Sequence, residues 1–260
     1  MVVAKKSLGQ NFLHDESVLK KIVEAGEITP EDTILEVGPG KGILTKELLN
    51  RAGKVIAIEL DDRLIPILKL EFLDRKNFTL IHDSALKFPA PKGRYKIIAN
   101  IPYYITSPLL NHYLRDQFES GNPPEMIIFM MQKEVADKII AKKEKDSVLS
   151  MEVKIFGDPE LVTYVPRSAF SPAPNVDSAV LKIKVAKEPK IRGELKKIFW
   201  LLHVSFAQKR KKLVNNLEGP LKISKEEIRK ILTACKINPD VRAEDLTLEK
   251  WQDLFDTLNL

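Results

Sequence analysis

The sequence predicts an α/β fold, in which a parallel sheet is covered by helices on both faces and is followed by a small helical domain. Short apolar runs typical of buried strands alternate with helical stretches from about residue 30 to residue 142. Two further strand-like runs then close the sheet, and after Glu188-Pro189 only helical periodicity remains. We therefore expect one domain over residues 1–187 and a second over 188–260.

The expected strands are rich in β-branched and other apolar residues and end at polar or glycine-containing turns. In chain order they cover residues 33–37, 54–60, 78–82, 95–100, 126–131, 161–165 and 176–185. The run over residues 176–185 shows the clearest alternation of outward and inward residues. The stretch 147–156 fits neither strand nor helix periodicity, and three prolines predict a semi-rigid loop over residues 166–174.

The expected helices carry apolar residues on one face. They cover residues 43–52, 61–72, 107–114, 133–142, 194–204, 225–234 and 248–258. Asp61 and Ser107 are expected to cap the second and third of these, because their side chains can accept from free backbone N–H groups. Pro108 suits a first helical position, where no N–H is needed.

Composition excludes several classes of protein. The chain is 44% hydrophobic and 30% charged, without an apolar run near the roughly 20 residues that span a bilayer. The start, Met-Val-Val-Ala-Lys-Lys, lacks the apolar core of a secretory signal. Cys235 is the only cysteine, which excludes an internal disulfide, and the four histidines have no metal-ligand spacing. We expect a cytoplasmic monomer that uses no metal and no membrane.

The net charge of +6 is concentrated in the second part of the chain. Residues 1–185 hold 26 basic and 25 acidic side chains, whereas residues 186–217 hold nine basic and two acidic ones. A one-sided charge of this kind suits a polyanion, because neutralised phosphates release condensed counterions. A solvated helix face is the alternative explanation.

A glycine-rich turn, Gly38-Pro39-Gly40-Lys41-Gly42, follows the first expected strand, and Glu59 lies near the end of the second. Glycines there let the backbone approach a ligand closely, and the acid can accept from ribose hydroxyls. The G-x-G-x-G spacing favours S-adenosylmethionine over a dinucleotide, which prefers a third glycine one residue later. By itself this turn leaves both cofactors possible.

The tetrapeptide Asn100-Ile101-Pro102-Tyr103 ends the fourth expected strand and decides between them. Adenine's exocyclic amine is a poor nucleophile, and an Asn oxygen with a backbone carbonyl can accept its two N–H bonds. Pro102 biases Ile101 toward an extended geometry, and Tyr103 offers a stacking surface. Hydride transfer needs no such motif, so the sequence predicts methylation of a planar amine.

These residues, with several separated motifs, resemble the small-subunit ribosomal RNA adenine N6,N6-dimethyltransferases over nearly the whole chain. The motifs are Lys5-Lys6-Ser7-Leu8-Gly9-Gln10-Asn11-Phe12-Leu13, Glu36 to Thr45, Asn100 to Pro108, Met130 to Ala136, Phe170 to Val180, Phe206 to Leu213 and Asn215-Asn216-Leu217. The resemblance implies a Rossmann-like, S-adenosylmethionine-dependent methyltransferase sheet with a small helical domain. It further implies dimethylation of two adjacent adenosines in the 3′-terminal hairpin of small-subunit rRNA during assembly of that subunit.

The resemblance also implies roles for individual residues. Residues 1–15 would cover the cofactor; without the resemblance they would be expected to form a disordered tail. The implied cofactor contacts come from Gln10, Asn11, Leu13, Gly38, Gly40, Glu59, Leu60 and Asn100. The last part of the chain would supply a basic helix that grips RNA phosphate through Lys209, Arg210, Lys211 and Lys212.

One position departs from the family pattern of Gly-Asp-Ala-Leu after the third strand. Aligning Ala85-Leu86 places Ser84 where the Asp belongs and Asp83 where the Gly belongs. Either side chain could contact the cofactor's adenine, and Asp83 could instead be a turn residue. We expect Asp83 to make the stronger contact.

For the substrate, we expect a flipped adenine to lie between Tyr103 and Phe170, with Asn100 and the Ile101 carbonyl on its amine. A core-filling role is the alternative for Phe170 and is the expected role of Tyr104. Competing functions are an adenine dimethyltransferase of large-subunit RNA, a non-catalytic assembly factor and a small-molecule methyltransferase. The Ser-Leu-Gly-Gln-Asn-Phe start and the basic tail favour the small-subunit enzyme.

Overall fold

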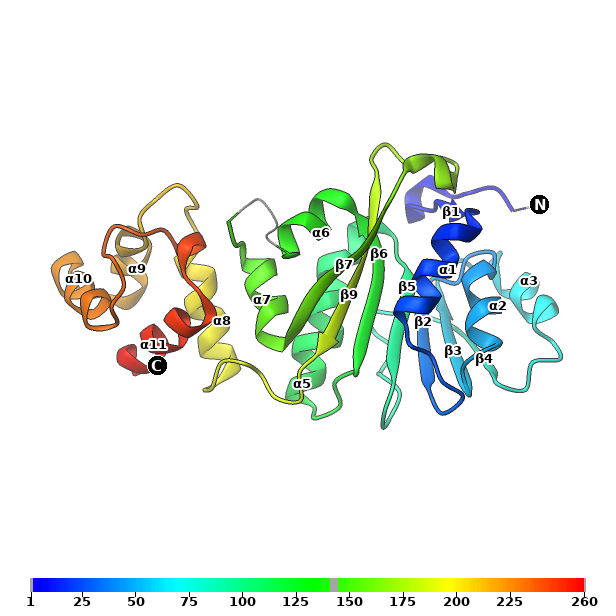
Figure 1. Cartoon of the computed structure of the whole chain (residues 1–260), viewed down its shortest axis with the longest axis horizontal. Helices are drawn as coiled ribbons and strands as arrows, with labels where there is room; N and C mark the ends of the chain where they lie inside the picture. Colours follow the sequence, from blue (N-terminus) through cyan, green and yellow to red (C-terminus); the bar gives the residue numbers. More distant parts are fainter. Residues whose placement is uncertain (1, 141–144, 260) are drawn as a thin grey trace. The chain divides into compact units, whose positions relative to one another are not determined.

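The computed structural model describes residues 2–140 and 145–259, and its contacts divide the chain into two compact units (Figure 1). The first unit runs to Ala136 and resumes over Asp158–Ala186. The second takes Asp137–Gly157 and the chain from Lys187 onward. The expected domain boundary at 187/188 lies beside the second break, but the packing of residues 137–157 with the helical unit was not expected.

The first unit is built on a seven-stranded sheet in the order β4-β3-β2-β5-β6-β9-β7. The strands are β2 (Thr33–Val37), β3 (Lys54–Glu59), β4 (Phe78–His82), β5 (Lys96–Asn100), β6 (Met126–Gln132), β7 (Gly157–Val165) and β9 (Ser178–Val185). From β4 to β6 all neighbours are parallel, and β9 is antiparallel to β6. The order reverses between β2 and β5, so the carboxyl ends of these strands flank a topological switch point, where ligands of such sheets bind.

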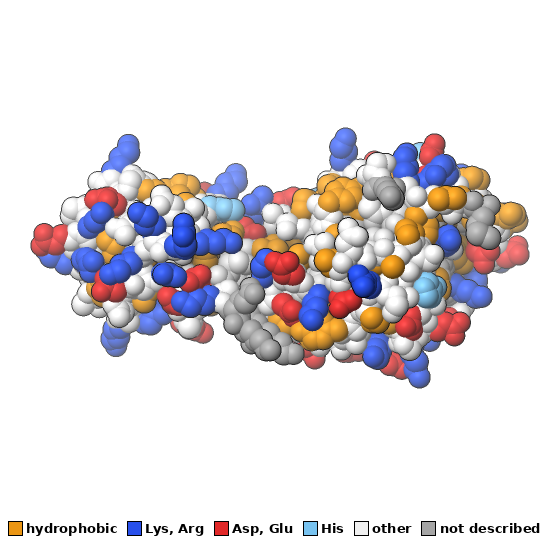
Figure 2. Space-filling view, turned by 90° about the horizontal axis from the view of Figure 1, so that it is seen from above, with side chains coloured by type: hydrophobic (Ala, Val, Ile, Leu, Met, Phe, Trp, Pro, Cys, Tyr) orange, Lys and Arg blue, Asp and Glu red, His pale blue; other side chains and the backbone are white. Residues whose placement is uncertain are grey.

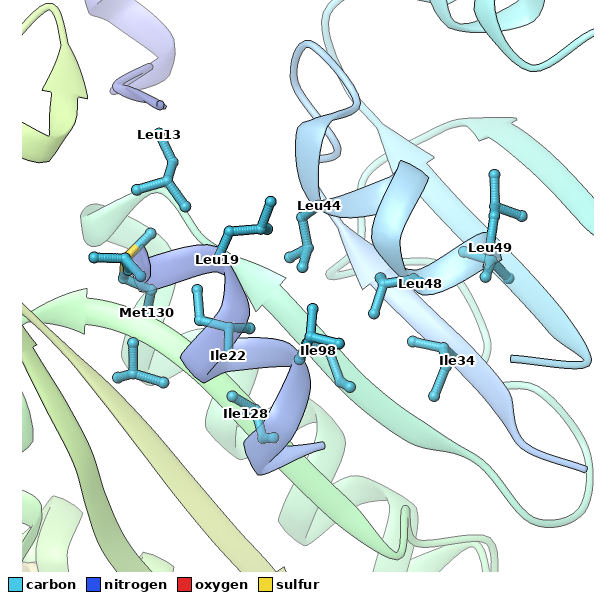
Figure 3. Close-up of a cluster of buried hydrophobic side chains, with 14 of the residues drawn as sticks. Leu13, Leu19, Ile22, Ile34, Leu44, Leu48, Leu49, Ile98, Ile128 and Met130 are labelled. Atoms are coloured by element: carbon cyan, nitrogen blue, oxygen red, sulfur yellow. The ribbon is translucent and has the colours of Figure 1, made fainter. Parts of the chain in front are cut away.

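Helices cover both faces of this sheet. They are α1 (Glu16–Ala25), α2 (Ile43–Leu49), α3 (Ile65–Glu71), α4 (Thr106–Asn111), a π-helical turn His112–Asp116, α5 (Gln117–Glu119) and α6 (Lys133–Ile140), which continues into the second unit. On one face, Ile22 of α1 and Leu48 of α2 pack with Ile98 and Ile128 of the sheet (Figure 3). Ile97 and Phe129 point the other way by strand alternation and are equally buried, so the second face is also closed.

The amino-terminal residues join the sheet unit through a short ladder instead of forming a tail. Strand β1 (Phe12–Leu13) pairs antiparallel with β8 (Phe170–Ser171), and the His14 N–H donates to the Ala169 carbonyl (3.0 Å). Leu13 is buried in the same apolar cluster as α1 (Figure 3). Residues 12–14 are thereby fixed beside the loop that precedes β9.

Two expected helix starts are wrong. α3 begins at Ile65, and Asp61 is drawn into side-chain contacts with Gln10 and Arg63 instead of capping it. α4 begins at Thr106 after a 3₁₀ turn, with Ile105 at its N-cap position, because the Thr106 hydroxyl bonds to the Tyr103 carbonyl. The last two residues of the helix expected over 133–142 lie outside the described residues.

The second unit is helical, and two of its helices were not expected. Its helices are α7 (Val148–Phe156), α8 (Leu195–Ser205), α9 (Leu213–Leu221), α10 (Lys225–Ala234) and α11 (Leu248–Leu258). α7 contacts α8 and α11, which is the physical reason for the placement of residues 137–157. Cys235, at the end of α10, is buried.

Among the described residues, none of the helices combines the length and hydrophobicity needed to cross a bilayer. Within the same ranges, acidic, histidine and cysteine side chains form no cluster suited to a metal ion.

Candidate active site

A cavity of about 300 Å³ opens at the carboxyl ends of β2, β3 and β5 in the first unit. Its walls come from the amino-terminal segment, the glycine turn, the ends of β3 and β4, and the turn after β5. Of the residues singled out by the sequence, it brings together Gln10, Asn11, Leu13, Gly38, Gly40, Glu59, Leu60, Asp83, Ser84, Asn100, Ile101, Pro102 and Tyr103. Phe170 and the basic residues 209–212 are not among its lining residues.

The glycine turn needs glycine for two different reasons. Gly38 and Gly40 both have positive φ (68° and 61°), a conformation that costs an ordinary residue energy. A Cβ at Gly40 would also meet the ring of Phe12 at 3.3 Å. The turn therefore brings bare backbone to the cavity, directly below the amino-terminal segment.

Glu59 is buried and organises the cavity floor through backbone donors. Its carboxylate accepts from the N–H groups of Gly40 (3.1 Å), Leu60 (2.9 Å) and Asp61 (2.8 Å). Burial raises the pKa of this carboxyl, and the three N–H donors oppose that shift. Each carboxylate oxygen can accept further bonds, so Glu59 can hold the turn and still receive hydroxyl donors.

Glu36, at the end of β2, is a buried acid that the sequence did not single out. It is 1% exposed, and its Oε2 has no partner among the described residues. Burial raises the pKa of Glu36 to about 8, and the nearby Glu59 carboxylate adds to the rise. A carboxyl in this state is protonated at neutral pH and can donate as well as accept.

Asn100 ends β5 at the cavity wall. Its Nδ2 donates to the Asn11 carbonyl (3.4 Å), and the Ile101 N–H donates to the Met130 carbonyl (3.4 Å). Because the amide nitrogen is directed at the amino-terminal segment, the side-chain oxygen Oδ1 is the group left to accept from another molecule. The Tyr103 hydroxyl is 2.6 Å from Ser178 Oγ on β9, which anchors that ring beside Asn100.

The two other aromatic residues lie differently from expectation. Phe170 is 3% exposed and belongs to the apolar cluster around Leu13, which is the core-filling alternative that the sequence left open. Tyr104 is 59% exposed and lines the cavity, so its expected role as core filler is wrong. The 3₁₀ turn after Pro102 directs Tyr104 outward, where its ring lies close to Gly9.

Asp83 and Ser84 both line the cavity next to the end of β4. The Asp83 N–H donates to the Glu59 carbonyl (3.2 Å), and its carboxylate accepts from the Ser84 N–H (2.6 Å). Asp83 is exposed and Ser84 is half-buried. Both side chains thus remain candidates for a ligand contact, as expected.

A model of the family described as ribosomal RNA adenine dimethylase matches residues 1–260. The chain belongs to this family. Ribosomal RNA small subunit methyltransferase A of Dehalococcoides mccartyi strain BAV1 is 44% identical over 257 residues, covering 96% of this chain and 87% of that protein. The protein of the same name from Lactococcus lactis is 41% identical, covering 98% and 90%.

Solved structures are similar over nearly the whole dimethylase chain. The 23S rRNA methyltransferase ErmE has a TM-score of 0.79 at 27% identity and covers 96% of this chain and 100% of that one. A dimethyladenosine transferase from Plasmodium falciparum has a TM-score of 0.80 at 28% identity, covering 96% and 98%. The Rossmann-like methyltransferase fold expected from the sequence is confirmed. The dimethylase is an rRNA adenine dimethyltransferase that uses S-adenosylmethionine.

The cavity of the dimethylase fits this methyl donor. Its floor is the glycine backbone at Gly40, where an added Cβ would meet the ring of Phe12. The Glu59 carboxylate can accept further bonds from hydroxyl groups, and Glu36 Oε2 has no partner among the described residues. A nucleoside joined to a charged amino acid needs this mixture of apolar walls and a few fixed acceptors.

Asp61, expected to be a helix cap, is a further functional residue of this region. It is 1% exposed, and its carboxylate accepts from Arg63 Nη2 (2.6 Å), Arg63 Nε (2.9 Å) and Gln10 Nε2 (2.8 Å). The Arg63 guanidinium is the main reason that the pKa of Asp61 is well below its usual range. Its place two residues after Glu59, at a strand end, was the signal available in the sequence.

In the second unit, the basic residues lie on a turn and not on the helix expected. Lys209, Arg210 and Lys211 connect α8 to α9 and are exposed, and their side chains have no partner among the described residues. Lys212 precedes α9 and pairs with Asp240 (2.9 Å). Asn216 of α9 shapes the turn by donating to the carbonyls of Ser205 and Gln208. Figure 2 shows Lys and Arg side chains close together over the part formed by α8–α11.

Proposed function

We propose that this dimethylase methylates the N6 amines of two adjacent adenosines in the 3′-terminal hairpin of small-subunit rRNA, within an assembling small ribosomal subunit. The observation that carries this proposal is Asn100, whose free Oδ1 lies at the rim of a cavity suited to S-adenosylmethionine. The relatives at 40–44% identity, which are named small-subunit methyltransferases, support the choice of subunit.

In the proposed mechanism, the target base leaves its stack and presents its amine to Asn100 Oδ1 and the Ile101 carbonyl. These acceptors stabilise the positive charge that grows on nitrogen during in-line transfer, and the proton leaves through them or to water. The donor's sulfonium supplies a reactive methyl group, so the protein mainly positions the partners. Tyr103, anchored at Ser178, is the proposed stacking surface, whereas Phe170 is buried in the apolar core.

The proposed cofactor contacts are the residues that line the cavity. Gly38 and Gly40 provide the backbone floor, Glu59 accepts from the ribose hydroxyls, and Asn11 and Leu13 cover the donor. Gln10, Leu60, Asp83, Ser84 and Asn100 complete the site. The basic turn of the second unit, Lys209 to Lys212, is proposed to hold RNA phosphate, and the protein is proposed to act as a monomer.

The discriminating experiment offers both purified ribosomal subunits, prepared without methylation, together with S-adenosylmethionine, and analyses each RNA by mass spectrometry. We expect two neighbouring N6,N6-dimethyladenosines in the small-subunit RNA and none in the large-subunit RNA. Methyl groups on the large-subunit RNA would favour the activity named for ErmE. Absence of incorporation by a folded protein would favour a non-catalytic assembly factor.

The same assay tests the catalytic assignment. Asn100→Ala should lower the rate of methyl transfer by at least about 100-fold, because a group that stabilises developing charge is lost. RNA binding by the variant should stay close to that of the parent. Asn50→Ala, an exposed position at the end of α2, is the matched control. Near-normal turnover in Asn100→Ala would reject the mechanism.

A further inference from the structure

We infer that Asp61 is a positioning residue: with Gln10 and Arg63 it holds the amino-terminal segment across the rim of the cofactor cavity and slows the release of the bound nucleoside. The residues Leu8 to Leu13 line the cavity on the side of the amino-terminal segment. The Asp61 contact ties them to the far wall.

Gln10 is the bridge between the segment and the sheet. Its Oε1 accepts from the Lys5 N–H (2.8 Å), which folds residues 5–10 into a compact turn. Its Nε2 donates to Asp61 Oδ2 (2.8 Å). Arg63 adds a second, longer connection by donating to the Val3 carbonyl (3.4 Å). Two side chains that follow β3 therefore hold the segment at two points.

Asp61 suits this role because its charged carboxylate is buried and both of its oxygens accept hydrogen bonds. Its side chain has no exposed surface, and it accepts one bond from Gln10, two from the Arg63 guanidinium and one from the Arg63 backbone N–H (3.2 Å). The Asp61 N–H also donates to Glu59 Oε1 (2.8 Å). Asp61 thus links the amino-terminal segment, which covers the cavity, to Glu59 on the cavity floor. Loss of the Asp61 carboxylate would leave the Gln10 donor unpaired, which costs free energy.

The geometry makes this contact a barrier to ligand release. Leu8 to Leu13 line one side of the cavity, and Glu59 and Leu60 line the other. A nucleoside held between them leaves by separation of the two sides, which breaks the bond from Gln10 to Asp61. Hydrogen bonds to charged groups are worth enough to change a rate about tenfold.

The test measures dissociation of S-adenosylhomocysteine by stopped-flow displacement, together with the KM for S-adenosylmethionine and kcat. Gln10→Glu has the same shape but places a second carboxylate against Asp61. We expect dissociation about tenfold faster, a raised KM and a kcat within about twofold of the parent. The amide of Lys5 should also exchange hydrogen faster in the cofactor-free variant. Asp62→Asn, an exposed acid next in the chain, should change none of these.

A swapped pair separates this role from a general loss of structure. Gln10→Glu combined with Asp61→Asn reverses the donor and acceptor, keeps the total charge and should return dissociation to within about threefold of the parent. Unchanged dissociation in Gln10→Glu would overturn the inference, and so would a folded swapped variant that releases ligand as fast as the single variant. If the swapped variant does not fold, Gln10→Ala decides: faster dissociation supports the inference and parental dissociation overturns it.

Discussion

At the scale of single residues, the site depends on acids whose surroundings set their protonation. Glu59 has three backbone donors, Asp61 has a guanidinium, and Glu36 has neither. Neighbouring acids with such different partners respond differently to pH. The protonated carboxyl of Glu36 is the one whose titration should be visible in the stability of the protein.

Stability should fall as the pH rises from about 4.5 to about 8, because of Glu36. Its pKa is raised from 4.5 to about 8, so the folded state keeps a proton that the unfolded state releases in this interval. Below the pKa that Glu36 has in the unfolded state, both states hold the proton, and this loss of stability is absent. Glu36→Gln should therefore stabilise the cofactor-free protein at pH 8, relative to pH 5, by more than about 1 kcal/mol. Urea unfolding at both pH values measures this difference.

The control for that prediction is Glu31→Gln, an exposed acid just before β2. It should leave the pH dependence of the unfolding free energy unchanged. An equal effect from both replacements would show that net charge, and not the buried carboxyl, is responsible.

Asp83 and Ser84 pose a question of specificity at the same scale. We expect Asp83→Ala to weaken S-adenosylhomocysteine binding more than Ser84→Ala, because a carboxylate is the stronger acceptor for an adenine amine. The loss of Asp83 should amount to roughly 1–2 kcal/mol. Calorimetry of both variants measures the order, and the reverse order would assign the contact to Ser84.

At the scale of elements, two lysines of the sheet hold the loop between α1 and β2. Lys96 of β5 is buried and donates to Asp32 Oδ2 (2.8 Å) and to the carbonyls of Gly26 and Glu27. Lys182 of β9 pairs with the Glu27 carboxylate. Lys96, at the first position of β5, thus supplies a buried cation that fixes where β2 begins, and β2 leads into the glycine turn.

Lys96→Met should lower the free energy of unfolding by about 3 kcal/mol, because it leaves the Asp32 carboxylate and two carbonyls without their cation. Burial is the largest single influence and acts to raise the pKa of Asp32, but the hydrogen bonds from Lys96 and Thr29 and the charge of Lys96 together keep that pKa below its usual value. Lys54→Met, at the exposed first residue of β3, is the matched control and should change stability by less than about 0.5 kcal/mol. Equal losses from both would remove the special role of the buried pair.

The sequence predicted the strands and helices whose apolar residues recur with a clear period. Every parallel strand lies within a residue of its expected limits. α1 was missed although Asp15 caps it through the N–H groups of Ser17 and Val18, since the residues before it were considered a tail. α7 was ambiguous because it is buried on most sides, and α9 contains Gly219 and Pro220, which disfavour a helix that packing nevertheless stabilises.

At the scale of the whole molecule, chemistry and charge belong to different units. The cavity lies within the first unit, and the exposed basic turn lies within the second. The motifs predicted the cavity residues because strand ends of a parallel sheet meet at one edge. They could not predict that Phe170 would face the core, that Asp61 would tie down the amino-terminal segment, or that the basic run would form a turn, since each depends on tertiary packing.

We expect RNA binding to weaken when Ala replaces Lys209, Arg210, Lys211 and Lys212. The slope of log K for RNA binding against log salt concentration should fall in magnitude by about 2 to 3. This change is slightly smaller than four unpaired cations would give, because Lys212 is paired with Asp240. Filter binding at several salt concentrations measures the slope. Lys225 and Lys230, each paired with a glutamate, provide the control, and their replacement should leave the slope nearly unchanged. An unaltered slope in the fourfold variant would show that these side chains do not bind RNA phosphate and form an ordinary solvated surface.

The single buried thiol has a practical consequence. Cys235 is the only cysteine of the chain, and its Sγ is directed at Thr257 Oγ1 of α11 (3.2 Å). A maleimide dye added to the native protein will therefore react slowly, whereas a cysteine placed at position 210 will be labelled selectively. Fluorescence from that one probe would follow the arrival of RNA in real time, without any need to remove the natural sulfhydryl.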